Sequence, residues 1–319
     1  NKKENNRYLF LNIMISPVNT SNSINETPII KITGGIFTAA FMWGSGNVVA
    51  RSLLIEGIDE IFLVTTRVTI ICTLLMIHYS IFNKDKFDKK LLKEASITAF
   101  VSIFSVGWFI VFSLQYISSG LVTLLISSAP VFTIIWLKIL LKEEKISRQK
   151  YLAIFIGLFG VLYLFISKET GLENQGNIFL GGSLAFMGVQ CIALSTVLNR
   201  KYARQYKVNS WLTYQYPIVA GLSLLAFLIT GTEVQVLNIS QILRVALLVI
   251  CNLGAFTSFT WLIQRVSALQ ASSVNYLVPV VGVTAGVIFL DETFNSNLIV
   301  AGIFIFISLI MNTKEEFSN

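Results

Sequence analysis

The sequence predicts an all-α integral membrane protein, with ten transmembrane helices in two inverted five-helix repeats and cytoplasmic N- and C-termini. Three observations lead to this fold class. The 319 residues are 54% hydrophobic and only 13% charged, with a mean hydropathy of +0.72, too little charge to cover a soluble protein of this length. Long apolar runs recur along the chain, and one long stretch occurs twice.

The apolar runs are each long enough to cross a hydrocarbon core of about 30 Å as a helix. Helices are expected because lipid offers no partner for free backbone N–H and C=O groups. Membrane β-barrels would instead show short alternating segments. The expected spans are 32–51, 60–82, 94–114, 117–140, 149–167, 177–199, 210–230, 242–262, 267–290 and 297–312.

The net charge of +7 follows the topology of the chain. With the N-terminus inside, 20 of the 24 basic residues fall on the cytoplasmic side, which is the bias that orients membrane proteins. Only Arg51, Lys168 and Arg244 face outward, and Arg67 lies within a span. The basic surplus therefore gives no reason to expect a nucleic-acid partner. The expected partners are the lipid bilayer and a small-molecule substrate, while a monomer and a homodimer both remain open.

The repeated stretch opens at Gln115 and again at Gln264, 149 residues later, and runs in step for about 29 residues. The identical pairs are Gln115/Gln264, Ser118/Ser267, Pro130/Pro279, Val131/Val280, Ile139/Ile288, Leu141/Leu290 and Glu143/Glu292. The matched prolines fall on spans 4 and 9, so each copy holds five spans. Because five is odd, the second copy enters the membrane upside down, an arrangement that many carriers use to hold substrate between two copies.

The predicted spans and the repeat divide the chain into a polar cytoplasmic tail (1–31), a first repeat (32–168), an outer linker (169–175), an inverted second repeat (176–312) and a short cytoplasmic tail (313–319). All three cysteines lie inside spans, which argues against a disulfide framework or a zinc site. Neither a cofactor nor a bound metal is expected.

Several local motifs together resemble the EamA-type carriers of the drug/metabolite transporter superfamily. They are Trp43-Gly44 followed by Asn47-Val48-Val49, Arg67 early in span 2, the stretch 129–164 and the stretch 277–305. The resemblance covers about residues 32–312. It implies ten helices around a central cavity lined mainly by spans 1, 3, 4, 6, 8 and 9. It also implies transport of small metabolites, often amino acids or related compounds and often outward.

Pro130 and Pro279 should each bend their span, because proline removes a helical hydrogen bond and clashes with the preceding turn. The bends either open a cavity and act as hinges or only improve packing. Arg67 lies about 10 Å into span 2, where a charge is costly unless it is paired or hydrated. It either anchors a substrate carboxylate or phosphate, or serves a structural role at the interface or at helix-end carbonyls.

Other cavity candidates are aromatic or uncharged polar residues within the spans. Tryptophans could form an aromatic box around substrate or belong to the interfacial belt. Amides and hydroxyls must face the bundle or a wet cavity, where they contact substrate or join helices. These candidates are Trp43, Trp108, Trp261, Asn47, Gln190, Asn252, Asn275, Tyr276, Ser127 and Ser128.

The acidic residues all fall in tails, loops or span ends, so Glu143 and Glu292 are expected to cap helices or anchor loops. Proton coupling commonly uses a carboxylate at mid-membrane, so facilitated movement, exchange or coupling through another group is the simpler expectation. Proton coupling stays an alternative, because a kinked helix can bring a terminal carboxylate to a wet cavity. Catalysis would need clustered nucleophiles, acids or metal ligands, and no such group occurs, so the protein is not expected to be an enzyme.

We therefore expect a carrier that works by alternating access in a bacterial inner membrane, with a eukaryotic organelle as the alternative location. Its substrate would be a small metabolite, an amino acid or related compound, moved outward. The alternatives are an exchanger for a phosphorylated or nucleotide-linked solute, which several cavity Lys or Arg residues would favour, and a membrane scaffold or sensor.

Overall fold

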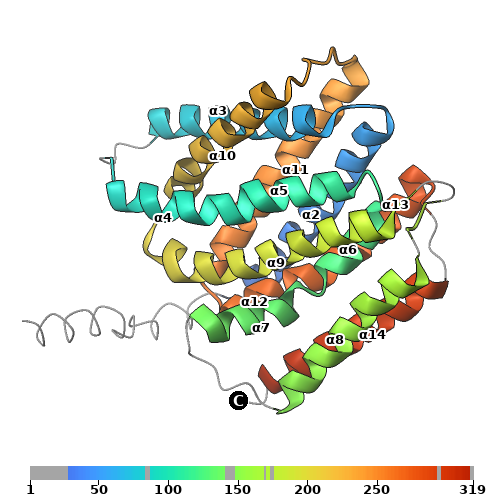
Figure 1. The fold of residues 1–319 in the computed structure, drawn as a ribbon. Coiled ribbons are helices and arrows are strands. Elements are labelled where there is room, and N and C mark those ends of the chain that lie inside the picture. Colours follow the sequence, from blue (N-terminus) through green and yellow to red (C-terminus); the bar gives the residue numbers. More distant parts are fainter. Residues whose placement is uncertain are drawn as a thin grey trace, which may run out of the picture.

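The computed structural model describes residues 28–82, 87–140, 148–168, 170–172, 176–292 and 296–316. Within these ranges every regular element is helical (Figure 1), which confirms the all-α prediction for this part of the chain. Some predicted segments and residues lie outside the described residues, namely most of the tail 1–31, Glu143, part of the linker 169–175 and residues 317–319.

The described helices follow the predicted spans closely. The first repeat contains α2 (Ile29–Ile55), α3 (Glu60–Phe82), α4 (Lys89–Ala99), the π-helix η1 (Phe100–Ser105), α5 (Val106–Ser113), α6 (Ser119–Ile126), α7 (Ala129–Leu140) and α8 (Arg148–Ser167). The second contains α9 (Ile178–Tyr202), the 3₁₀-helix η2 (Ala203–Gln205), α10 (Val208–Thr230), α11 (Ile239–Ile263), α12 (Ala268–Ser272), α13 (Val274–Leu290) and α14 (Ser296–Glu316).

Seven helical stretches in the described residues are long and apolar enough to cross a membrane. They are Glu60–Phe82, Lys89–Ser113, Ser119–Leu140, Ile178–Gln205, Val208–Thr230, Ile239–Ile263 and Gln270–Leu290, with a shorter apolar helix at Ser296–Ser308. Large apolar side chains such as Phe37, Leu228 and Phe289 are exposed on the bundle, as expected for lipid contact. The chain is a multi-pass membrane protein, while the count of ten crossings and the side of each terminus remain predictions.

The helices pair across the two repeats in a self-consistent way. α2 packs on α11 and α13, and its counterpart α9 packs on α5 and on the α6–α7 segment. Counterparts also meet directly, since α3 packs on α10 and α8 on α14, and the α6–α7 segment meets its counterpart α12–α13 through the contact of α6 with α13. Figure 1 shows the α8–α14 pair at one edge of the bundle. Exchanging one repeat for the other therefore reproduces these main contacts.

The matched serines explain part of the internal repeat. Ser118 caps the N-terminus of α6 by accepting a hydrogen bond from the Leu121 N–H, and Ser267 caps α12 in the same way through the Gln270 N–H. A serine at this position satisfies one of the N–H groups that a helix start leaves free.

Two arginines also occupy related positions in the two repeats. The Arg51 guanidinium donates to the carbonyl of Leu114 at the end of α5. Arg204 Nε donates to the carbonyl of Ile263, which is 149 residues beyond Leu114 at the end of α11. Each cation therefore stabilises the free carbonyls at a helix C-terminus, and both repeats use this contact.

The helix breaks near the matched prolines differ between the repeats. In the first repeat the chain leaves α6 at Ser127 and resumes at Ala129, next to Pro130. In the second, the break lies at Ser273 and Pro279 sits inside α13. Serine hydroxyls bond back to their own turns at both breaks, for example Ser127 to the Leu124 carbonyl and Ser273 to the Gln270 carbonyl. Such bonds compete with regular helix, so serine placement and not proline alone sets where each span breaks.

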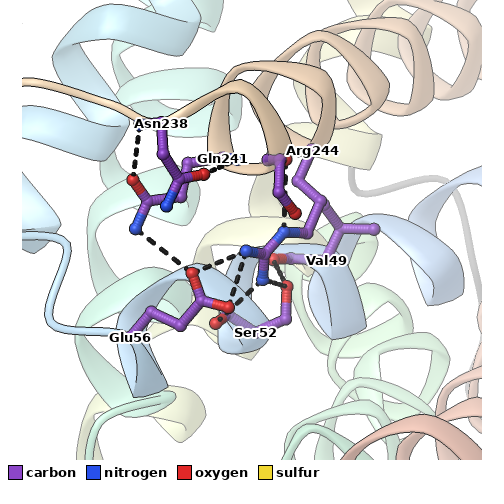
Figure 2. Close-up of polar contacts among 7 residues, drawn as sticks. Val49, Ser52, Glu56, Asn238, Gln241 and Arg244 are labelled. Atoms are coloured by element: carbon purple, nitrogen blue, oxygen red, sulfur yellow. Dashed lines mark hydrogen bonds and ion pairs between the residues drawn. The ribbon is translucent and has the colours of Figure 1, made fainter.

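A polar cluster joins the end of α2 to the start of α11 (Figure 2). Arg244 Nη2 lies 2.6 Å from both carboxylate oxygens of Glu56, and Gln241 Nε2 donates to the same carboxylate at 3.1 Å. The Arg244 hydrogen bond holds the pKa of the exposed Glu56 carboxyl below its ordinary value. Asn238 and Gln241 form a capping box at the start of α11. The two repeats are therefore tied together at the end predicted to face outward.

Candidate functional site

A cavity lies between the two repeats and is lined by residues from both. The contributing elements are α2, α3, η1, α5 and α6 of the first repeat, and α9, α10, α11 and α13 of the second. Its polar lining consists of Asn47, Arg67, Ser102, Ser195, Thr196, Asn199, Gln215, Tyr216, Asn252, Thr260 and Asn275. A polar interior within an apolar bundle is the expected form of a carrier binding site.

Irregular backbone occurs where several lining helices pass the cavity. The span α4–η1–α5 widens into the π-helix η1, which carries Ser102. Pro217 lies inside α10 directly after the lining residues Gln215 and Tyr216. Pro279 lies inside α13 and leaves the carbonyl of Asn275 without its helical N–H partner. π-Turns of this kind are frequent at functional sites, and a wet cavity can satisfy the backbone groups that they release.

Arg67 is the cationic group of the cavity. It is 7% exposed, and its guanidinium lies against Gly107 of α5, where an added Cβ would sit 2.9 Å from Nη2. Glycine at this position therefore makes room for the guanidinium. Among the described residues the lining contains no Asp or Glu, so none of their carboxylates balances this charge within the cavity.

An aromatic group occupies the part of the cavity formed by α2 and α11. Trp43 meets Phe256 edge-on at a centroid distance of 5.7 Å and Phe259 at 5.2 Å. The neighbouring Gly46 faces α11 as well, where an added Cβ would lie at an ordinary van der Waals distance of 3.5 Å from Cys251 Cβ. These rings offer an apolar surface to the body of a ligand.

Amide side chains supply hydrogen-bonding groups to the same cavity. Asn252 uses its Nδ2 to donate to the Leu248 carbonyl at 2.9 Å, which leaves its carbonyl oxygen as an acceptor. Two hydrogen bonds hold the Asn199 amide in place. Its Nδ2 donates to the Ser195 carbonyl at 2.9 Å, and its Oδ1 accepts from Trp211 Nε1 at 3.0 Å. Asn275 is buried in the lining. The cavity therefore combines one cation, several amides and an aromatic wall.

A protein-family model for the EamA-like transporter family matches residues 31–166 and 179–314. The chain belongs to the EamA-like transporter family. The two matched segments correspond to the two repeats. An uncharacterized transporter of Bacillus subtilis, YoaV, is 23% identical over 89% of this chain and 97% of its own length. A WAT1-related chloroplast protein of Arabidopsis thaliana is 24% identical over 80% of this chain and 63% of its own length.

The fold is also similar to a solved structure. One crystal structure superposes with a TM-score of 0.64 at 16% identity, covering 88% of this chain and 95% of the other. At this identity the likeness concerns the fold alone. In this EamA-like chain, the resemblance inferred from the sequence motifs is confirmed by the family match.

The structure brings together five of the eleven residues that the sequence proposed for the cavity of this EamA-like chain. They are Trp43, Asn47, Arg67, Asn252 and Asn275. They come from α2, α3, α11 and α13, so they are distant in sequence and meet only through the packing of the two repeats. Their role in substrate binding remains a proposal.

The other six candidates lie outside the cavity lining. Trp108 packs between Phe104 and Phe112, and Trp261 lies under the Arg265 guanidinium at 4.4 Å. Ser127 and Ser128 are buried and donate to the carbonyls of their own turn. Gln190 and Tyr276 also lie off the lining, and Tyr276 packs against the apolar core.

Sequence reasoning missed several residues of the cavity, including Ser102, Asn199, Gln215 and Tyr216. The signal at Gln215 and Tyr216 was available, because two polar residues directly precede Pro217 within an apolar run. Ser102 carried no such signal, since a π-turn has no simple sequence pattern. Among the described residues, no group of three or more His, Cys, Asp or Glu could hold a metal ion.

Proposed function

We propose that this EamA-like transporter moves a small metabolite across the bacterial inner membrane by alternating access at the cavity between its two repeats. The supporting observation is the cavity itself, which both repeats line with polar side chains inside an apolar bundle. Two pseudo-equivalent halves around one site can rock about it and expose it to each side in turn. The expected substrate is an amino acid or related compound, and the expected direction is outward.

A cavity-filling variant tests this proposal. Val106→Trp places a large ring among the lining residues, whereas Leu225→Trp makes a similar change at an exposed apolar position on α10. In proteoliposomes loaded with a broad metabolite panel, the wild-type protein and Leu225→Trp should show counterflow of the same solutes. Val106→Trp should reduce that counterflow about tenfold or more, because the bulky ring excludes substrate.

The direction is measured in cells that express the same three proteins. Outward transport predicts that a small set of metabolites accumulates in the medium with wild type and Leu225→Trp but not with Val106→Trp. Depletion of the medium would make the protein an importer. If folded wild-type protein moves no solute of the panel in counterflow, the transport proposal is wrong.

A further inference from the structure

Four hydrogen-bond donors in the cavity have no partner within the described residues. Arg67 makes no hydrogen bond or ion pair there, and Ser102 Oγ, Gln215 Nε2 and Tyr216 Oη are buried without hydrogen bonds. Each of the four side chains is more than nine-tenths buried. Buried polar groups in folded proteins almost always have a partner, so four such donors in one cavity require an explanation.

The four residues converge from neighbouring helices. Arg67 on α3 contacts Gly107, which follows Ser102 by five residues in the same span. The Arg67 and Tyr216 side chains are close enough to interact electrostatically, and Gln215 precedes Tyr216 on α10. α10 packs on both α3 and η1. All four donors therefore belong to the part of the cavity lining that α3, η1 and α10 form.

This donor set is suited to an anion. A guanidinium carries five N–H donors and no acceptor, and the amide NH₂ and both hydroxyls can also donate. The cavity lining supplies no carboxylate, although an isolated buried cation is costly unless something pairs with it. A ligand with negatively charged oxygens would satisfy all four groups at once.

Other arginines of this chain show what a structural role looks like here. Arg51 donates to the Leu114 carbonyl, and Arg204 donates to the carbonyls of Ile263 at 3.1 Å and Val266 at 2.6 Å. Both therefore stabilise the ends of helices. Arg67 makes no such bond although it is more deeply buried than either, so the helix-end role does not describe it.

We propose that Arg67, Ser102, Gln215 and Tyr216 form a subsite for the carboxylate group of a small organic acid. This inference rests on the proposed transport function and specifies the chemical class of its substrate. A planar guanidinium matches a carboxylate with two parallel hydrogen bonds. One cation balances the single charge of a carboxylate, whereas a phosphate carries close to two charges at neutral pH and would remain partly unbalanced.

The first test compares stability with binding in purified protein. Arg67→Gln should unfold at the same temperature as wild type or a higher one without ligand, because it removes an unpaired buried charge. A structural arginine would instead lower the unfolding temperature when replaced. Tyr216→Phe and Ser102→Ala should also leave the unliganded protein folded, since each removes a hydroxyl without an internal partner.

Binding is measured as ligand-induced thermal stabilisation with a library of amino acids and small organic acids, each paired with its neutral amide. Acids should stabilise wild type and their amides should not. Arg67→Gln should weaken binding about ten- to a hundredfold, as expected for hydrogen bonds to a charged group, and Arg67→Lys should weaken it less. Thr69→Val is the matched control, because Thr69 is another unpartnered hydroxyl on α3 that does not line the cavity.

Four results would overturn the subsite. They are equal stabilisation by acids and amides, unchanged binding in Arg67→Gln, no stabilisation by any acid, and stronger stabilisation by inorganic phosphate or phosphorylated compounds. The last result would support the exchanger for phosphorylated solutes. Counterflow separates the two proposals, since transport of neutral solutes alone would keep the function and remove the subsite. Binding of acids without any counterflow would keep the subsite and remove the transport function.

Discussion

Glu292 accepts three hydrogen bonds at the N-terminus of α6, a helix of the other repeat. Its carboxylate oxygens lie 2.7 Å from the Ser119 N–H nitrogen, 2.9 Å from Ser119 Oγ and 3.0 Å from the Gly120 N–H nitrogen. These N–H groups have no partner within α6 itself, and the helix dipole favours a negative charge there. A single carboxylate just beyond the end of α13 thus holds the start of α6, through Ser119, which lies 173 residues earlier in the chain.

Replacing this carboxylate should therefore destabilise the bundle. Glu292→Gln keeps the shape of the side chain but removes its charge and half of its acceptor capacity, and should lower the free energy of unfolding by about 1–3 kcal/mol. Thermal or chemical unfolding of the purified protein measures the change. Asp291→Asn is the control, because Asp291 is exposed with φ 52°, a conformation that asparagine also tolerates. Equal stability of the two variants would contradict the capping role.

At the scale of elements, α6 and α13 cross at very short range. An added Cβ at Gly282 of α13 would lie 2.9 Å from Thr123 Cβ and 2.5 Å from its Cγ2. Small residues at such crossings let the backbones of membrane helices approach each other. Because α6 and α13 carry the matched stretches of the two repeats, this crossing brings the repeats together beside the cavity.

The crossing predicts opposite effects for two glycine substitutions. Gly282→Ala should force α6 and α13 apart and lower the free energy of unfolding by about 1–3 kcal/mol. Gly221→Ala on α10 meets nothing within 4 Å and should be neutral or stabilise the helix by up to about 1 kcal/mol. Both values come from unfolding of the purified variants. A Gly282→Ala protein as stable as Gly221→Ala would show that the two helices do not need this close approach.

At the scale of the whole molecule, two features bear on how the chain is oriented in the membrane. They are the pairing of helices across the repeats and the charge bias of the loops. Arg244 and Glu56 lie at the end that the charge bias places outside. Arg204 and the loop around Tyr206 lie at the end that it places inside. The predicted odd number of spans per repeat would turn the second repeat over.

Cysteine accessibility tests this orientation. In a background with Cys72, Cys191 and Cys251 replaced by alanine, Val236→Cys introduces a thiol at a position that is 96% exposed. A membrane-impermeant maleimide should label it in intact cells. Lys207→Cys, exposed at the opposite end, should react only after the membrane is permeabilised. Labelling in the reverse pattern would show that the topology is inverted. Labelling of both positions in intact cells would contradict the predicted arrangement of spans.

A residue of the site could be predicted from the sequence where its own chemistry restricts the surroundings that it can occupy. Arg67, Asn47 and Asn275 stand out because a polar group in hydrocarbon must face something polar. Trp108 and Trp261 carry no such constraint, since an aromatic ring packs equally well on core, lipid or ligand. Ser127 and Ser128 can satisfy themselves within one helical turn, so their polarity did not reveal which way they face.

The sequence by itself determined the membrane class, the helical elements and the internal duplication, because hydropathy, helix length and repeat spacing are local properties of the chain. Only the tertiary structure decided which polar residues share the cavity and which carboxylate caps which helix. Those choices depend on the rotation of each helix about its axis and on contacts between the repeats. A rotation of about 100° per residue moves a side chain from cavity to lipid, and only packing against the other repeat sets that angle.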